Sequence, residues 1–144
     1  MTGVQTCALP ISCEDVDLGW RAQLRGWRCV YAPRAVVYHK LASTGGGPTA
    51  SYFDGRNSIH VLVKNVPGIV WRLYWRSILL RQLQLAVQAL RSWRGAAARA
   101  SLRGQLAGLA AVPAMLAARR RVQAARLISD EQVLALLSSP PQYS

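Results

Sequence analysis

Hydrophobic positions recur every three or four residues through the second half of the chain, a spacing that places them on one side of an α-helix. The pattern predicts a long amphipathic helix over residues 68–94. It also predicts one or two further helices over 96–126, with an interruption near Pro113. This half of the chain is therefore expected to be mostly α-helical.

Two shorter helices are expected on either side of that region. One covers residues 52–65 and should end before Pro67, because the residue that precedes a proline disfavours helical geometry. The other follows Ser129, whose side chain suits an N-cap, and runs to Leu137.

The first part of the chain begins with a short helical pattern over 13–25. Ser12 is the expected N-cap, because Asp15 follows three residues later in a capping-box-like position. Gly26 is expected to end this helix, since glycine readily adopts the left-handed conformation found after many helix ends.

The next residues have a strand-like pattern. Residues 27–32 and 35–39 are rich in β-forming side chains and lie on either side of a turn at Pro33 and Arg34. They predict a β-hairpin. The expected fold class is therefore α/β: a helix and a β-hairpin, followed by a mostly α-helical region.

The charge of the chain is strongly positive and unevenly distributed. The 144 residues carry a net charge of +12, and no acidic residue lies between Asp54 and Asp130. Basic amphipathic helices of this kind suit an anionic membrane surface. A nucleic-acid partner is not expected, because the chain has no recognition motif of the usual kinds. No apolar stretch reaches the roughly 18 to 20 residues that would span a bilayer.

Acidic residues are concentrated in one place. Glu14, Asp15 and Asp17 are three of the six acids of the chain and fall within four positions. Acids this close raise each other's pKa unless a cation or a helix N-terminus compensates. The run fits either a site that handles protons or a metal, or a solvated first helical turn.

The run belongs to a longer string, EDVDLGWR, followed by Gly26-Trp27-Arg28 and Pro33-Arg34-Ala35 and by a predicted strand that ends at His39. Residues 13–67 resemble the acceptor-side half of family 2 glycosyltransferases, particularly the rhamnosyltransferase type. The resemblance implies that the helix and hairpin come from the end of a GT-A (Rossmann-like) domain.

The same resemblance assigns roles to individual residues. It makes Asp15 the general base, with Glu14 and Asp17 holding it or tuning its pKa. It makes His39 a ligand of the divalent metal, Mg²⁺ or Mn²⁺, of the intact enzyme. Substrate-binding residues are expected at four positions: Trp20, Arg21, Arg56 and Asn57. Each has a plainer alternative, such as packing for Trp20 or a solvated surface position for Arg56.

The expected organisation has four parts. Residues 1–11, MTGVQTCALPI, resemble a translated sequencing adapter, so 1–12 are taken as an artefact or disordered. Residues 13–67 are the end of a catalytic domain, 68–137 a basic amphipathic helical region, and 138–144 a disordered tail.

The function expected from the resemblance is that of an inverting glycosyltransferase. It would move a sugar, with rhamnose as the expected one, from a nucleotide-sugar donor to a lipid-linked or polysaccharide acceptor in cell-envelope synthesis. The expected location is cytoplasmic and peripheral, at the inner face of a bacterial plasma membrane. As a fragment, the chain is expected to be inactive alone and not to bind the metal. The alternative is a non-enzymatic basic module that binds a membrane surface or a protein.

Overall fold

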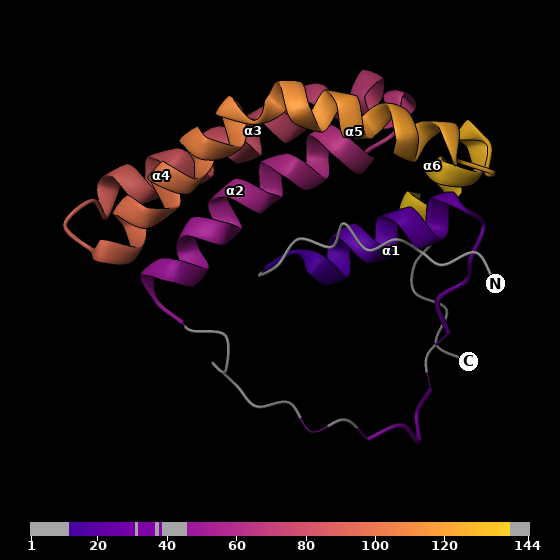
Figure 1. Cartoon of the computed structure of the whole chain (residues 1–144), viewed down its shortest axis with the longest axis horizontal. Coiled ribbons are helices and arrows are strands. Elements are labelled where there is room, and N and C mark those ends of the chain that lie inside the picture. Colours follow the sequence, from indigo (N-terminus) through magenta and orange to yellow (C-terminus); the bar gives the residue numbers. More distant parts are fainter. Residues whose placement is uncertain (1–11, 31, 37, 39–45, 139–144) are drawn as a thin grey trace.

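The computed structural model describes residues 12–30, 32–36, 38 and 46–138. Within these residues the chain forms six α-helices, arranged as in Figure 1. They are α1 (Glu14–Leu24), α2 (Pro48–Asn65), α3 (Gly68–Arg91), α4 (Ala96–Ala110), α5 (Val112–Ala124) and α6 (Asp130–Ser138). The described residues contain no β-strand.

Helix α2 is the central element, and α4 and α5 follow one another along it in the same direction. Gly104 of α4 lies against the carbonyl oxygen of Tyr52, near the start of α2. Further along, Arg119 of α5 donates hydrogen bonds to the carbonyl oxygens of Val63 and Val66, at 3.0 and 2.5 Å. These bonds satisfy carbonyl groups that the end of α2 would otherwise leave unpaired. Figure 1 shows α4 and α5 as one arch above α2.

The hydrophobic core lies where α1 and α6 pack on the junction between α2 and α3. Its buried members are Leu24 of α1, Val66 and Val70 from the α2–α3 junction, and Val133 of α6. Because these residues come from distant parts of the sequence, the core joins the first helix to the last.

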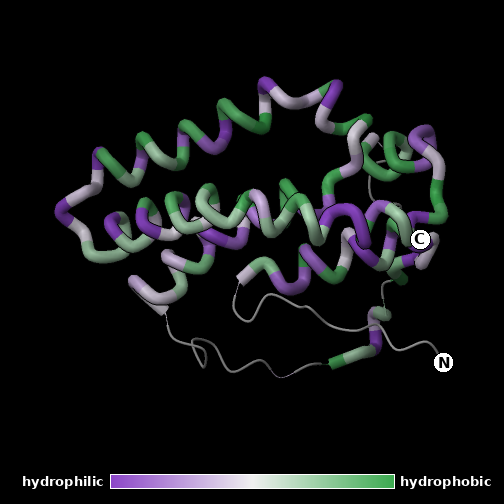
Figure 2. Tube along the Cα trace, turned by 45° about the horizontal axis from the view of Figure 1, so that its top comes forward, coloured by the Kyte–Doolittle hydropathy of each residue, from purple (hydrophilic) through white to green (hydrophobic). Residues whose placement is uncertain are grey.

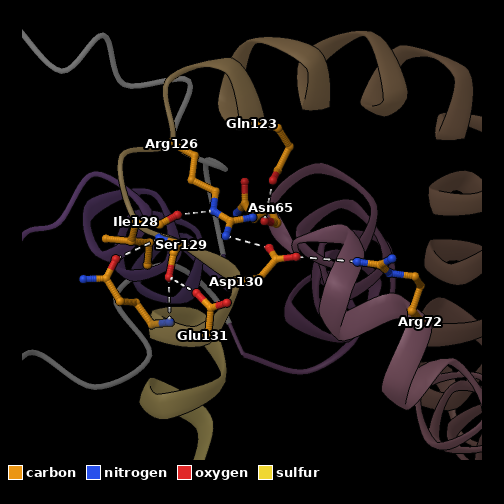
Figure 3. A network of polar contacts seen from close by, with 9 residues as sticks. Asn65, Arg72, Gln123, Arg126, Ile128, Ser129, Asp130 and Glu131 are labelled. Atoms are coloured by element: carbon orange, nitrogen blue, oxygen red, sulfur yellow. Dashed lines mark hydrogen bonds and ion pairs between the residues drawn. The ribbon is translucent and has the colours of Figure 1, made fainter.

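A polar network fastens α6 to its neighbours (Figure 3). Asp130 forms ion pairs with Arg126 at 2.7 Å and with Arg72 of α3 at 3.5 Å. The N-terminus of α6 has the capping-box arrangement, in which Ser129 Oγ accepts from the Gln132 backbone N–H and Gln132 Oε1 accepts from the Ser129 backbone N–H. The prediction that Ser129 caps this helix is confirmed.

The predicted β-hairpin is wrong, and with it the α/β fold class: the described structure is all-helical. Side chains of the predicted hairpin are exposed, by 64% at Trp27, 82% at Val30, 75% at Val36 and 95% at Tyr38. A two-stranded hairpin is marginal in water unless a further strand or a helix covers one face. No such cover is present among the described residues, so β-forming side chains alone do not produce strands here.

The first helix agrees with the prediction at its end and differs at its start. The N–H of Gly26 bonds to the Gln23 carbonyl at 2.9 Å, and the N–H of Trp27 bonds to the Ala22 carbonyl at 3.1 Å. Gly26 has a φ of 77°, so this is a Schellman ending, as expected. The expected cap by Ser12 is wrong, because Cys13 occupies the N-cap position and makes no side-chain cap hydrogen bond.

Candidate functional site

The acidic run separates into one buried and two exposed carboxylates. Asp17 is fully buried, whereas Glu14 and Asp15 are exposed on the first turn of α1. Residues two apart on a helix point to different sides, so a run of neighbouring acids cannot all face the same environment.

Asp17 lies at the centre of a buried polar cluster between α1 and α2. The Lys64 ammonium is 2.6 Å from Asp17 Oδ1, and Asn65 Nδ2 donates to the same oxygen at 2.7 Å. Arg21 Nε makes an ion-pair contact of 3.2 Å with Asp17 Oδ2, one helical turn away. Both oxygens of Asp17 are therefore engaged by residues of the chain itself.

This cluster explains how the acidic turn is positioned. Lys64 and Asn65 lie in the last turn of α2. Their contacts with Asp17 therefore fix the orientation of α1 relative to α2. Only 7% of the Lys64 side chain is exposed. A buried ammonium is stable only when a negative charge lies close to it, and Asp17 supplies that charge. The sequence interpretation missed Lys64 and Asn65; a Lys-Asn pair in an otherwise apolar stretch, HVLVKNV, was the available signal.

Asp15 is one of the two carboxylates of the run that face outward. Its Oδ1 accepts a hydrogen bond from the Val16 backbone N–H at 2.7 Å, and the side chain is exposed. A carboxylate at this end of a helix interacts favourably with the free N–H groups of the first turn. Asp15 is thus held by its own helix while remaining open to a hydroxyl group that approaches from solvent.

The acidic turn has a further neighbour on α2. The pKa of the Cys13 thiol is raised, first by its burial and then by the negative charges of Asp54, Asp15 and Glu14. Asp54 therefore shares the electrostatic environment of the α1 N-terminus. The negative charges of these three carboxylates all act on the Cys13 thiol, in a chain whose overall charge is strongly positive.

An apolar groove of about 550 Å³ extends from this turn. It is lined by side chains of α1, α2 and α3, together with Leu137. Cys13, directly before Glu14, belongs to the lining, as do Trp20, Val61 and Ile78. The site thus combines exposed carboxylates with an adjacent hydrophobic surface.

Of the remaining predicted site residues that the structure describes, Trp20 lines the groove, whereas Arg56 and Asn57 do not. Trp20 is partly buried and packs against the core, consistent with its packing alternative. Asn57 is fully buried and donates to the Ser12 carbonyl at 3.0 Å, whereas Arg56 is half-buried one turn before His60. His39, the predicted metal ligand, lies outside the described residues.

His60 is also buried in α2. Burial is the main cause that lowers its pKa, and the positive charges of Arg56 and Lys64 lower it further. Its Nε2 atom has no hydrogen-bond partner among the described residues. A neutral imidazole fits this environment.

The described residues do not fit a Mg²⁺ or Mn²⁺ site. Among them, no group of three or more His, Cys, Asp or Glu side chains could hold a metal ion. These cations require several oxygen ligands, and both oxygens of Asp17 already contact cationic or amide groups.

Comparison with known proteins relates this chain to glycosyltransferases. It is 36% identical over 87 residues to the N-acetylglucosaminyl-diphospho-decaprenol L-rhamnosyltransferase of Mycobacterium tuberculosis, in the strains CDC 1551 / Oshkosh and ATCC 25618 / H37Rv. The match covers 56% of this chain and 28% of the relative. The chain is therefore a distant and partial homologue of a rhamnosyltransferase.

Two other comparisons gave no match. No family model matches the sequence, and no solved structure is similar to it. Membership of family 2 and the GT-A fold stay predictions from the resemblance.

Proposed function

We propose that this chain supplies the acceptor-side part of an inverting glycosyltransferase of the family 2 type. The reaction would transfer a sugar, with rhamnose as the expected one, from a nucleotide-sugar donor to a lipid-linked or polysaccharide acceptor. The name of the mycobacterial relative, which combines L-rhamnosyl transfer with a diphospho-decaprenol compound, supports this substrate class. Because the chain spans 28% of that relative, the activity belongs to a larger protein in this proposal.

The observation that carries the proposal is the exposed carboxylate of Asp15 on a turn anchored by the buried Asp17 cluster. An acceptor hydroxyl is a weak nucleophile, and a carboxylate within hydrogen-bond distance can take its proton in the transition state. The acceptor oxygen would form its bond to the anomeric carbon on the face opposite the nucleotide. The bond between that carbon and the diphosphate would break, and the nucleoside diphosphate would leave with the bonding electrons.

The groove beside the turn has a role in the same proposal. Its apolar lining, which includes Cys13 and Val16 on either side of Glu14 and Asp15, suits the hydrocarbon portion of a lipid-linked acceptor. Trp20 would contact that portion from α1, since it lines the groove. Arg21, Arg56 and Asn57 would position the surrounding backbone and the α1 N-terminus.

We expect the isolated 144-residue chain to be inactive, because the described residues provide neither a nucleotide-binding sheet nor a metal site. Transfer of sugar by the purified chain from a nucleotide donor would contradict that expectation. We further propose that the complete enzyme is cytoplasmic and peripheral at the inner face of a bacterial plasma membrane.

The test is a transfer assay in a full-length enzyme that carries this acidic turn. Asp15→Asn should lower kcat about 100-fold or more, the range usual for a lost general base. The KM for the donor and the melting temperature should be unchanged, because Asp15 is exposed. Glu14→Gln is the comparison, since it neutralises the neighbouring exposed acid; it should lower kcat much less, because Glu14 supports the base in this proposal and does not take the proton itself. Near wild-type turnover by Asp15→Asn would remove this residue from the base role.

A further inference from the structure

Helix α3 presents a side on which most side chains are exposed. Residues 73, 76, 80, 83, 87 and 91 follow one another at intervals of three and four, so they share this side of the helix. They are Leu73, Arg76, Leu80, Leu83, Val87 and Arg91, and we call them the outer face of α3. Three leucines, one valine and two arginines therefore share one stripe, and all of them except the partly buried Val87 are exposed.

The inner side of α3 is occupied by the rest of the molecule. Val70 and Ala89 are buried, and Ile78 lines the groove shared with α1 and α2. On the outer face, a hollow is lined by residues of α3 alone, among them Leu80, Leu83 and Arg91. Leu83 lies at the edge of this face, because it also lines a hollow shared with α2 and α4. Figure 2 shows α3 along one edge of the molecule, with strongly hydrophobic positions between hydrophilic ones.

The exposure of these leucines is large for a soluble surface. Leu73, Leu80 and Leu83 are 55%, 56% and 60% exposed, and the same helix ends close to Trp93, which is 60% exposed. Scattered exposed leucines are ordinary, but a continuous apolar stripe along a helix marks an interaction site.

The positive charge around this stripe favours an anionic partner. Residues 55–129 contain no acid, and α3 itself carries arginines only. Arg76 has its guanidinium carbon 5.6 Å from the centre of the Trp75 ring, so a cation and an aromatic ring lie together beside the stripe. Leucine, tryptophan and arginine on one helix suit the boundary between lipid headgroups and acyl chains. Nucleic acid would use the arginines but would leave the leucines exposed.

We propose that the outer face of α3 docks flat on an anionic lipid bilayer. Leu73, Leu80 and Leu83 enter the headgroup and upper acyl region, and Arg76 and Arg91 contact lipid phosphates. The helix lies in the plane of the surface, since none of the described helices is long and apolar enough to cross a membrane. With 24 residues, α3 provides a contact line of about 36 Å. This docking assigns a surface to the peripheral membrane location proposed above, and it does not depend on the transfer reaction.

The test uses the full chain and sedimentation with vesicles of phosphatidylglycerol and phosphatidylcholine in equal parts. Arg76→Gln with Arg91→Gln should weaken binding by about 25-fold, because each basic residue near an anionic surface contributes about fivefold. Arg103→Gln with Arg120→Gln is the matched control. It removes the same charge from exposed positions on α4 and α5 and should weaken binding only a few fold.

A second pair tests the apolar contact separately from charge. Leu80→Ser should weaken vesicle binding about fivefold, whereas Leu106→Ser, at a position of α4 that is 66% exposed, should leave it unchanged. Circular dichroism should be the same for all four variants, since the substituted side chains are exposed.

Three results would overturn the proposal. One is that both double arginine variants weaken vesicle binding equally, which would indicate attraction by net charge alone. Another is absence of binding to anionic vesicles at low salt. The third is a dimer in sedimentation velocity that Leu80→Ser dissociates while vesicle binding is unaffected, which would assign the outer face to a second copy of the chain.

Discussion

Replacing Asp17 by Asn tests whether the buried cluster holds α1 in place. The substitution keeps the shape of the side chain and an oxygen that can still accept from Asn65, but removes the negative charge. Lys64, with 7% of its side chain exposed, then has no counter-charge at Asp17. Arg21 loses its ion-pair partner as well. The variant thus isolates the effect of charge from that of packing.

The expected loss of stability is large. Removing one partner of a buried ion pair usually costs about 3–5 kcal/mol, because the remaining charge stays desolvated. For a chain of this size, that corresponds to a fall of about 10–20 °C in melting temperature. It is also a large part of the roughly 5–15 kcal/mol by which domains are stable.

Thermal melts followed by circular dichroism would measure this effect on the 144-residue chain. Asp15→Asn is the control, because it removes the same charge two residues away from an exposed position. Lys64→Met in the Asp17→Asn background should restore part of the loss, since it removes the stranded charge. A melting temperature of Asp17→Asn within a few degrees of wild type would refute the account of the cluster.

The remaining predictions concern pH, thiol chemistry and packing. The pKa of His60 is lowered in the folded state, so the unfolded chain binds a proton more readily. The contribution of His60 to stability should therefore be constant above the ordinary histidine pKa of about 6.5 and decrease as the pH falls below it. Urea titrations at several pH values should show that the stability of His60→Gln varies less with pH than that of the wild type. Cys13, whose pKa is raised, should react with iodoacetamide more slowly at pH 8 than the exposed Cys29, and equal rates in peptide mapping would contradict this. Gly104→Ala should destabilise the chain by about 2 kcal/mol or more, because the added Cβ would overlap the Tyr52 carbonyl oxygen. Gly19→Ala has open space around it and should be neutral or stabilising by up to about 1 kcal/mol. Thermal melts followed by circular dichroism would measure both.

Helix positions were predictable because local signals and tertiary packing agree. The last helix has its capping serine at Ser129, α3 begins directly after Pro67, and α5 begins beside Pro113. Each of these boundaries depends on one residue type with a specific backbone preference. The β-hairpin failed for the opposite reason. Strand formation depends on a neighbouring sheet or helix, and local preference at Val30 or Val36 cannot supply one.

The candidate site was predictable only in part. The sequence singled out the acidic run, but spacing alone could not tell which acid is buried. That depends on Lys64 and Asn65, which lie almost fifty residues further along the chain and meet Asp17 only in the folded state. The role of Asp15 as a base stays a prediction, supported by its exposure and by the distant homology to a rhamnosyltransferase.

The central claim is that two acids of one helix divide their tasks, Asp17 fixing the turn and Asp15 acting on the acceptor. Sugar transfer and melting temperature, measured on the same preparations of a full-length enzyme carrying this turn, test that claim most directly. Asp15→Asn should lose transfer and keep its melting temperature. Asp17→Asn with Lys64→Met should keep most of its transfer activity and recover part of the melting temperature that Asp17→Asn loses. The claim is contradicted if Asp15→Asn still transfers sugar, or if the double variant melts normally but is inactive.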